Sequence, residues 1–281
     1  MRLLMLRLLI ISLIGSFLNA NDVDKEKVLN FLKKSVAPTK NYKIEDIRVV
    51  GSKDLDSLKG WKVFFVKIDL KILGKDKKIT ISDKIFTNGS VVARDLLDIK
   101  STRSIKSHYV LDFEPKYYKD ENIIYGNKTA PNKLVVFSDP MCPFCMSFMP
   151  DIINLVKKYP EKFVLYYYHF PLNIHPNSPT LIKASLAAKK LGVKDVDLKV
   201  YEEAFDFDEK KDEKEILISF NKAIGTNLTL QDINHPEIIK HLEDDMKIVN
   251  ELGLMGTPRL FVNGKFDKDR KMYKKLVKEN P

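Results

Sequence analysis

Residues 133–158 read KLVVFSDPMCPFCMSFMPDIINLVKK, and the second half of the chain can be interpreted outward from them. Residues 133–140 have an apolar centre and predict a buried strand that ends in a turn. After the turn, the apolar residues at positions 145, 148, 149, 152, 155 and 156 recur at the spacing of one helix face. Cys142 and Cys145, the only two cysteines in 281 residues, therefore stand at the start of a predicted helix.

The start of a helix suits a reactive thiol, because its unpaired backbone N–H groups carry partial positive charge and stabilise a thiolate. Cys142 is thus predicted to be the attacking sulfur. Cys145, one turn deeper on the same face, can close a disulfide with it or resolve a mixed disulfide. Pro143 suits the first helical turn, and Phe144 adds no charge between the cysteines. The strand, turn and helix around the pair favour redox chemistry.

Two other interpretations of the cysteine pair are weaker. A structural zinc site usually has four ligands, and the chain has no second cysteine pair to supply them; a Cys₂His₂ site would need two of its five histidines as well. A purely structural disulfide across two residues closes a very short loop and adds little chain-entropy stabilisation. We therefore expect no metal and no organic cofactor.

Residues 1–20 predict a secretory signal peptide, with a basic start, a short apolar core and a small residue at the end. An uncleaved anchor is the alternative, but the apolar run is short for a membrane span. Export predicts an oxidising compartment, the periplasm. The formal charge of +10 arises from lysines and acidic residues scattered along the whole chain, as on a solvated surface. We expect no nucleic-acid partner.

The mature length predicts two domains. Residues 21–100 predict a small α+β domain: an amphipathic helix over 22–36, an alternating strand over 61–73 and a hairpin at Asn88-Gly89. Nothing in this domain predicts catalysis, and an open sheet edge could pair with a second copy of the chain. A self-contained domain without a partner is the alternative. Residues 101–132 are polar and predict a partly helical linker.

Residues 133–281 form the second predicted domain. Residues 163–168 predict a central strand, and residues 178–252 predict a helical insertion with helices over 179–191, 198–207, 213–223 and 236–252. His175 lies between, beside a proline, where a histidine more often packs a loop than acts chemically. A strand over 259–262, which follows Gly256-Thr257-Pro258, and a last helix over 269–278 complete the domain.

The cysteine motif together with the distant Gly256-Thr257-Pro258 resembles the thioredoxin-like Dsb family of exported disulfide oxidoreductases. The resemblance implies a thioredoxin fold, Cys142 as nucleophile, Cys145 as resolving thiol, and a cis Pro258 that faces them. It also implies that Thr257, Pro258, Pro143 and Phe144 contact substrate. Thr257 is similar to the residue of the DsbC and DsbG branch, whereas the helical insertion looks like DsbA. The N-terminal domain looks like the cystatin-like dimerisation domain of DsbC and DsbG.

Two departures from the family pattern affect the expected redox behaviour. Val136 stands where thioredoxin and DsbA carry a buried carboxylate, and Asp139 sits in a turn where we expect it to be exposed. Phe144 replaces the histidine of DsbA and cannot stabilise the thiolate by charge. We therefore predict a reduction potential less oxidising than that of DsbA.

Together these features predict a homodimeric periplasmic thiol–disulfide oxidoreductase, most plainly a disulfide isomerase or reductase of exported proteins. Its membrane redox partner would be DsbD-like or, for the rival function of dithiol oxidase, DsbB-like. Another class of function is a peptide-binding chaperone that works without redox chemistry; a Cys142→Ser, Cys145→Ser double variant would separate the two. A third is a maturation factor dedicated to one client.

Overall fold

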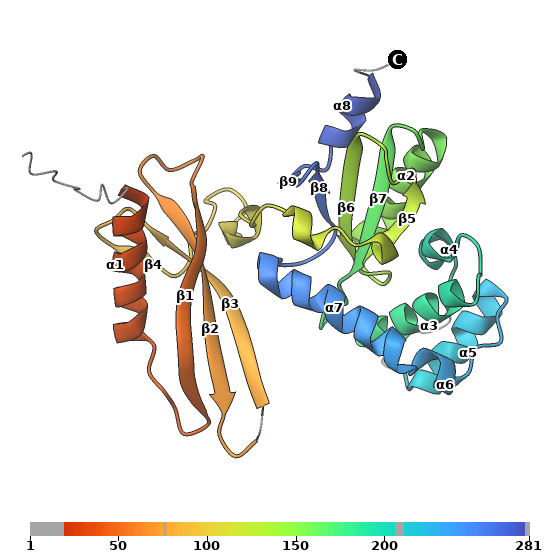
Figure 1. Ribbon diagram of the computed structural model, residues 1–281, viewed down its shortest axis with the longest axis horizontal. Coiled ribbons are helices and arrows are strands. Elements are labelled where there is room, and N and C mark those ends of the chain that lie inside the picture. Colours follow the sequence, from red (N-terminus) through yellow and green to blue (C-terminus); the bar gives the residue numbers. More distant parts are fainter. Residues whose placement is uncertain (1–19, 76, 206–210, 279–281) are drawn as a thin grey trace, which may run out of the picture. The chain divides into compact units, whose positions relative to one another are not determined.

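The computed structural model describes residues 20–75, 77–205 and 211–278, and its contacts divide the chain into two compact units (Figure 1). The first unit holds residues up to 80 together with 85–93, and the second holds 81–84 and the chain from 94 onward. Residues 1–19 of the predicted signal peptide lie outside the described part. The two units are described separately below.

The first unit is one helix against a four-stranded sheet with the strand order β1-β2-β3-β4. The β1–β2 and β3–β4 pairs are antiparallel, and Thr87 pairs with Val92 across the predicted Asn88-Gly89 turn. This matches the predicted helix and alternating strand. The elements are α1 (Ala20–Ser35), β1 (Tyr42–Asp54), β2 (Lys62–Ile72), β3 (Lys77–Thr87) and β4 (Val92–Ala93).

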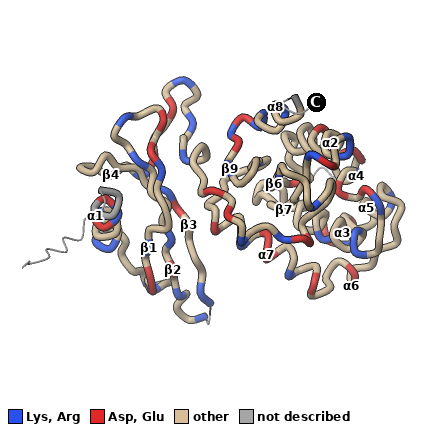
Figure 2. Tube along the Cα trace, turned by 45° about the horizontal axis from the view of Figure 1, so that its top comes forward, with Lys and Arg blue, Asp and Glu red and all other residues tan. Residues whose placement is uncertain are grey.

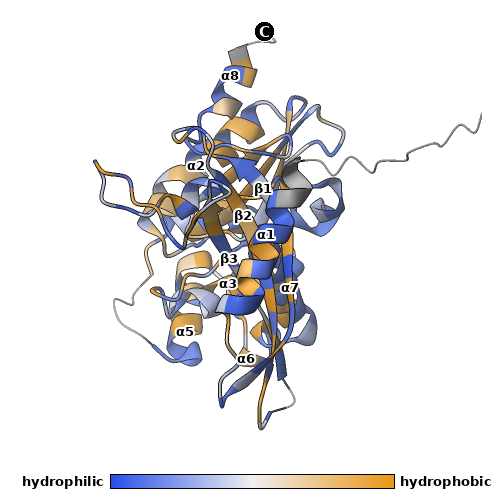
Figure 3. Ribbon diagram, turned by 90° about the vertical axis from the view of Figure 1, so that its left-hand side faces the viewer, coloured by the Kyte–Doolittle hydropathy of each residue, from blue (hydrophilic) through white to orange (hydrophobic). Residues whose placement is uncertain are grey.

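The core of this unit lies between α1 and the sheet, and the helix runs along one face of the strands (Figures 1 and 3). Val28 and Leu32 of α1 are buried in one cluster with Phe64 and Val66 of β2, as the two periodicities predicted. The strand β1 is not among the predicted elements. Two register shifts interrupt its ladder with β2, which breaks the simple alternation that marks a strand in sequence.

The second unit is built on a five-stranded mixed sheet with the order β5-β7-β6-β8-β9. The central pair, β6 and β7, is parallel, and the other pairs are antiparallel. The strands predicted over 163–168 and 259–262 are confirmed. The strands are β5 (Ile123–Gly126), β6 (Asn132–Ser138), β7 (Phe163–His169), β8 (Arg259–Val262) and β9 (Lys265–Phe266).

The helices predicted over 179–191, 213–223 and 236–252 are confirmed within one residue at each end. The helix predicted over 198–207 begins two residues earlier and ends at Glu202, and positions 206 and 207 lie outside the described residues. Helices α3, α4, α5 and α6 gather together beyond the sheet (Figure 1). Thr229 and Asp232 form a reciprocal capping box at the start of α6. The last helix begins three residues later than predicted. The helices are α2 (Pro143–Lys158), α3 (Ser178–Lys190), α4 (Val196–Glu202), α5 (Glu213–Ile224), α6 (Leu230–Ile233), α7 (Pro236–Leu252) and α8 (Met272–Lys278).

Alternation along β6 divides the core of this unit into two layers. Leu134 and Val136 lie in the cluster that contains the buried residues of α2, whereas Val135 and Phe137 lie in the cluster that contains those of α7. All four side chains are fully buried, as expected for a central strand with both faces covered. The arrangement is the mixed α/β sheet with flanking helices that the thioredoxin resemblance implied.

The prediction of a linker over residues 101–132 is wrong for much of its length. Val110 and Phe113 are buried in the α7 side of the core, and β5 pairs with β7. This segment looked like a linker because its turns are short 3-10 helices with few periodic apolar residues: Ile105–His108, Pro115–Tyr117 and Asp120–Asn122. It is part of the second unit.

Lysines, arginines and acidic residues are scattered along the chain in both units (Figure 2). This is the solvated surface predicted from the scattered charges. Among the helices that the structure describes, none has the length and apolar character needed to cross a bilayer.

Candidate functional site

The end of β6 brings the two distant parts of the predicted site together. β6 and β8 are antiparallel and Phe137 pairs with Arg259, so the residues just before β8 lie beside the turn that follows β6. The Thr257–Pro258 peptide bond is cis, as the resemblance implied. Cys142 Sγ lies 3.7 Å from the carbonyl oxygen of Thr257, which accepts a hydrogen bond from this thiol when the thiol is protonated. Residues 115 positions apart therefore share one site.

Cys142 caps the N-terminus of α2, and Pro143 occupies the first helical position. The backbone N–H groups of Cys145 and Met146 donate to the carbonyl oxygen of Cys142 at 2.8 and 2.9 Å. Both cysteines are free thiols; Cys142 is 4% exposed and Cys145 is fully buried. The predicted placement of the pair at a helix start is confirmed.

The surroundings of Cys142 favour its thiolate. A hydrogen bond from the Cys145 thiol lowers the pKa of Cys142 to about 5, and the Thr257 side chain and the backbone N–H groups of Cys145 and Phe144 act in the same direction. Burial opposes them by disfavouring the charge. At neutral pH Cys142 is therefore the ionised, nucleophilic sulfur of the pair.

Cys145 behaves in the opposite way. Burial, followed by its hydrogen bond to Cys142, raises the pKa of the Cys145 thiol well above its usual range. Thr257 and Ser138 side chains and the Asp139 backbone partly offset this rise. The Thr257 Oγ1 atom is itself buried without a hydrogen-bond partner among the described residues, so its hydrogen is available to a sulfur that becomes charged. The site thus holds one thiolate and one protonated thiol.

The residues predicted to contact substrate differ in exposure. Phe144 is 71% exposed and Pro143 is also exposed, so both present apolar surface directly beside the cysteines. Thr257 is half-buried and Pro258 is buried. Pro258 therefore supports the position of Thr257, whose carbonyl oxygen contacts Cys142, more than it offers surface of its own.

The expectation that Asp139 is exposed is wrong: its carboxylate is fully buried and accepts four hydrogen bonds. Oδ1 accepts from the Met141 N–H at 2.8 Å and from Ser178 Oγ at 2.6 Å. Oδ2 accepts from the Leu172 N–H at 2.8 Å and lies 2.8 Å from His175 Nδ1. These partners satisfy the buried charge and tie the turn before Cys142 to residues 172–178. The sequence around the cysteines could not predict this burial, because three of the four donors belong to residues 172–178.

His175 lies outside the group of residues that contact the sulfurs. Its side chain is mostly buried against Asp139, and its backbone N–H donates to Leu172. The interpretation that this histidine packs a loop describes its place in the structure.

The sequence did not point to a group of buried hydroxyls beneath Cys145. Tyr201 of α4 donates to Ser138 Oγ at 2.7 Å, and its oxygen lies 2.6 Å from the hydroxyl of Tyr167. Ser138 is the last residue of β6 and also hydrogen-bonds Cys145, whose pKa it lowers. The only available signal was alternation, which places Ser138 on the same face as Val136 and hence toward α2.

Among the residues that the structure describes, one cluster elsewhere in this unit consists of side chains that can ligate a metal. His169, His241 and Asp245 bring one nitrogen or oxygen each within 4.8 Å of one another. His169 Nδ1 lies 2.7 Å from Asp245 Oδ2, and Asn122 Nδ2 donates to Asp245 Oδ1 at 2.9 Å. The carboxylate is thus already engaged by hydrogen bonds that join β7, α7 and the segment before β5. We assign it a structural role.

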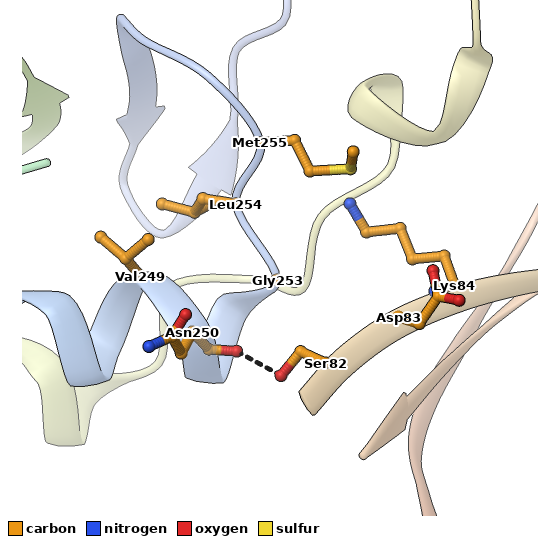
Figure 4. A pocket seen from close by; sticks show the side chains of 8 residues that line it. All are labelled: Ser82, Asp83, Lys84, Val249, Asn250, Gly253, Leu254 and Met255. Atoms are coloured by element: carbon orange, nitrogen blue, oxygen red, sulfur yellow. Dashed lines mark hydrogen bonds between the residues drawn. The ribbon is translucent and has the colours of Figure 1, made fainter. Parts of the chain in front are cut away.

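A pocket of the second unit lies apart from the cysteine site (Figure 4). Ser82 Oγ donates to the carbonyl oxygen of Asn250 at 2.7 Å at its edge. Its lining includes neither cysteine and neither residue of the cis peptide bond. The lining residues are Ser82, Asp83, Lys84, Val249, Asn250, Gly253, Leu254 and Met255.

The mixed sheet, the dithiol at a helix start and the facing cis-proline define a thioredoxin-type protein. A family model described as Thioredoxin matches residues 119–279, which is more than half of the chain. The chain belongs to the thioredoxin family. The match begins inside the segment that the sequence had predicted as a linker, in agreement with the packing of that segment on the sheet.

Similarity to individual proteins is low. The chain is 26% identical over 152 residues to the Na(+)/H(+) antiporter NhaA 1 of Mycolicibacterium vanbaalenii, a match that covers 52% of this chain and 24% of that protein. The chain thus spans about a quarter of the length of the curated relatives it matches.

Sequence identity to solved structures is similarly low. BdbD from Bacillus subtilis in its oxidised form is 20% identical, with a TM-score of 0.48 and coverage of 60% of this chain and 95% of that chain. A thioredoxin-like oxidoreductase from Silicibacter pomeroyi is 23% identical, with a TM-score of 0.46 and coverage of 57% and 92%. Family membership rests on the family model rather than on these structures.

Proposed function

We propose that this chain is a thiol–disulfide oxidoreductase that acts on exported proteins in the periplasm, chiefly as a disulfide isomerase or reductase. One observation carries the proposal: a thiolate-favouring Cys142 at the start of α2 stands beside a protonated, buried Cys145. A pair with such opposed pKa values has an attacking sulfur and a reserve sulfur in one site.

The reaction is an exchange of sulfur–sulfur bonds. The Cys142 thiolate attacks one sulfur of a substrate disulfide, a mixed disulfide forms, and the other substrate sulfur leaves as a thiolate that takes up a proton. In isomerisation, a second substrate thiolate attacks the mixed disulfide and releases Cys142 unchanged. In reduction, Cys145 attacks Cys142, closes the Cys142–Cys145 disulfide and passes its proton through solvent to the departing substrate thiolate.

The exposed ring of Phe144 and the backbone of Thr257 are suited to hold a peptide across the sulfurs. The carbonyl oxygen of Thr257 lies 3.7 Å from Cys142 Sγ. An extended substrate strand that lies beside the cis peptide bond would therefore lie next to the nucleophile. Apolar contact with Phe144 and Pro143 requires no particular side chain in the substrate. We infer a broad preference for unfolded or partly folded protein chains.

The first unit is proposed to dimerise. Its sheet leaves the 13-residue strand β1 at one edge, where backbone N–H and C=O groups can pair with another chain. The two register shifts in β1 shorten the stretch available for a regular ladder, so we expect pairing on either side of them. Two catalytic sites in one dimer would raise the effective concentration of thiol around a bound client. Sedimentation of the full chain measures this directly: a monomer at micromolar concentration contradicts the proposal.

The test of the chemistry is trapping of the mixed disulfide. A Cys145→Ser variant should accumulate a covalent adduct with a disulfide-bonded peptide, whereas a Cys142→Ser variant should form none. Adducts of equal yield in both variants, or in neither, would reject Cys142 as the nucleophile. Mass spectrometry of the intact adduct identifies the cysteine that carries it.

The direction of the reaction is tested by trapping the thiols of the exported protein with a mass-tagging reagent. Mostly reduced cysteines fit an isomerase or reductase that a DsbD-like membrane donor keeps reduced. Mostly oxidised cysteines would instead identify a dithiol oxidase recharged by a DsbB-like partner, the function that the helical insertion of α3 to α7 favours.

A further inference from the structure

The resolving thiol faces a chemical difficulty in this site. Cys145 is fully buried, and burial disfavours the negative charge that its sulfur must carry when it attacks the mixed disulfide. The carboxylate of Asp139, in the turn before the cysteines, already accepts four hydrogen bonds from other groups. Val136, on the neighbouring strand, is apolar and fully buried. Stabilisation of the charge must come from another source.

The hydroxyl groups of Ser138, Tyr201 and Tyr167 form a hydrogen-bonded line that ends at this sulfur. Ser138 Oγ hydrogen-bonds Cys145 and accepts from Tyr201 at 2.7 Å, and the Tyr201 oxygen lies 2.6 Å from that of Tyr167. Ser138 is fully buried and Tyr201 and Tyr167 are nearly so. The three residues come from β6, α4 and β7, so the packing of three separate elements holds the line in place.

The number of hydroxyl hydrogens determines which group in this line donates to which. Each hydroxyl has one hydrogen to donate. If Tyr167 donates to Tyr201 and Tyr201 donates to Ser138, the hydrogen of Ser138 remains for the sulfur. In the reverse direction the hydrogen of Tyr167 would need a further acceptor, and the described residues show no second partner for it. Since an unsatisfied buried donor is costly, the direction toward Cys145 is favoured.

We propose that Ser138 is a catalytic hydrogen-bond donor to the sulfur of Cys145 during resolution of the mixed disulfide, and that Tyr201 and Tyr167 are positioning residues that orient it. The inference rests on the proposed function, since it concerns the second step of that reaction. The hydroxyls stabilise the developing charge and take up no proton. The Cys145 proton still passes to the departing substrate thiolate, the Cys142–substrate bond breaks, and the Cys142–Cys145 bond forms.

The other titratable groups around Cys145 have separate partners. Cys142 shares its helix, and its sulfur is bonded to substrate at this step. Asp139 follows β6 and is bound by His175, and Asp197 of α4 is paired with Lys189 at 3.1 Å. His169 of β7 packs against the ring of Tyr167 and is bound to Asp245. Among the described residues, Ser138 and Thr257 are therefore the polar side chains, apart from Cys142 itself, that form a hydrogen bond with the Cys145 sulfur.

The experiment uses the full reduced chain and the aromatic disulfide reagent DTNB, which needs no protein client. Attack by Cys142 releases one coloured thiolate, and attack by Cys145 on the resulting mixed disulfide releases a second. Stopped-flow absorbance separates the two phases, and the ratio of the second rate to the first is the readout. A chain that fails to act on protein disulfides still reports on Cys145 in this assay, so failure of the proposed function and failure of this inference are distinguishable.

We expect Ser138→Ala to lower this ratio roughly threefold at neutral pH. Loss of the donor raises the pKa of Cys145 and so lowers its thiolate fraction, while the greater nucleophilicity of the more basic sulfur offsets part of this loss. Tyr201→Phe should give a smaller decrease. The double variant should match Ser138→Ala alone, because the Tyr201 hydroxyl acts only through Ser138.

The matched control is Tyr168→Phe. Tyr168 is the next residue along β7, is equally buried and donates its hydroxyl hydrogen to the Tyr117 carbonyl oxygen on the opposite face of the sheet. The Tyr168→Phe variant loses a buried hydroxyl but leaves the hydroxyls of Ser138, Tyr201 and Tyr167 in place, so its ratio of the second rate to the first should equal that of the wild type. An unchanged ratio in Ser138→Ala would overturn the proposal. So would additive decreases in the double variant, or an equal decrease in Tyr168→Phe, because these indicate a general loss of packing.

Discussion

His175 Nδ1 lies 2.8 Å from Oδ2 of Asp139, and this contact joins the loop before α3 to the turn that carries the cysteines. The same carboxylate accepts from the Leu172 backbone and the Ser178 hydroxyl. Three donors from residues 172–178 therefore converge on one buried charge. The turn before Cys142 owes its conformation to a segment that follows β7 as much as to its own residues.

The first prediction concerns this carboxylate. Asp139→Asn removes the charge and points an amide N–H₂ group at two of the four donors, so we expect a loss of about 2–4 kcal/mol in the free energy of unfolding. Urea denaturation at neutral pH measures it. Asp151→Asn on the exposed face of α2 is the matched control and should change stability by less than about 0.5 kcal/mol. Equal stability of the two variants would show that the buried contacts contribute little.

The second prediction concerns the reactivity of Cys142. With its pKa lowered to about 5, the thiolate predominates at neutral pH, so the rate of alkylation by iodoacetamide should be nearly constant from pH 7 upward and should fall as the pH drops through 5. Because the hydrogen bond from Cys145 is the largest cause, a Cys145→Ser variant should move the midpoint upward. A midpoint near the ordinary value of 9.0 in the unmodified chain would contradict the assignment.

The same pKa predicts how the stability of the reduced protein depends on pH. Cys142 has a lower pKa in the folded chain than its ordinary value of 9.0, so its contribution to stability is fully present above pH 9 and is lost as the pH falls toward 5. Comparison with a Cys142→Ser variant isolates this contribution. The difference in unfolding free energy between the two proteins should shrink steadily on acidification across that range, and a constant difference would refute the shift.

The reduction potential should lie between those of thioredoxin and DsbA. A nucleophile pKa of about 5 falls between roughly 7 for thioredoxin and roughly 3.5 for DsbA, so we expect a potential between roughly −270 and −120 mV. Equilibration with glutathione measures it. Phe144→His should make the potential more oxidising by some tens of mV, on the order of a one-unit change in thiolate stabilisation, and Phe144→Leu should leave it unchanged. A potential at or above that of DsbA in the unmodified chain would refute the prediction.

Two glycines test how closely β5 is held against β7. Both Gly126 and Gly192 have positive φ, at 87° and 81°, but a Cβ on Gly126 would lie 2.1 Å from the Phe163 carbonyl oxygen, whereas one on Gly192 would meet nothing within 4 Å. Gly192→Ala should cost about 1 kcal/mol of stability through backbone strain alone. Gly126→Ala should cost about 3 kcal/mol or more, because the strand must also move. Similar losses for both, by thermal or urea unfolding, would show that β5 adjusts freely.

The sequence predicted those parts of the site that local patterns specify. The apolar strand, the turn, Pro143 and the helix spacing after Cys145 together placed the dithiol at a helix start. The helix over 236–252 has the predicted bounds because Pro236 and Gly253 mark its two ends. The cis Pro258 came from resemblance, since spacing alone did not distinguish it from an ordinary strand entry.

The features that were missed depend on contacts between distant residues. Asp139 looked exposed because an acidic residue in a turn usually is, and its four donors are visible only in the folded chain. Tyr201 lies 63 positions from Ser138, in a helix whose pattern indicates burial but not the partner of its hydroxyl. β5 is four residues long and partly buried, too short to stand out in a polar segment.

The three consecutive tyrosines of β7 have one further consequence. Residues 163–168 are apolar or aromatic without alternation, so hydrophobicity alone does not tell this strand which side chains belong on which face. The hydroxyl groups distinguish the two faces, because that of Tyr167 hydrogen-bonds Tyr201 on one side of the sheet and that of Tyr168 donates to the Tyr117 carbonyl oxygen on the other. A slip of one residue would leave both hydroxyls buried without partners. The hydroxyl groups of these otherwise apolar side chains therefore specify the register of β7, the central strand of the redox domain.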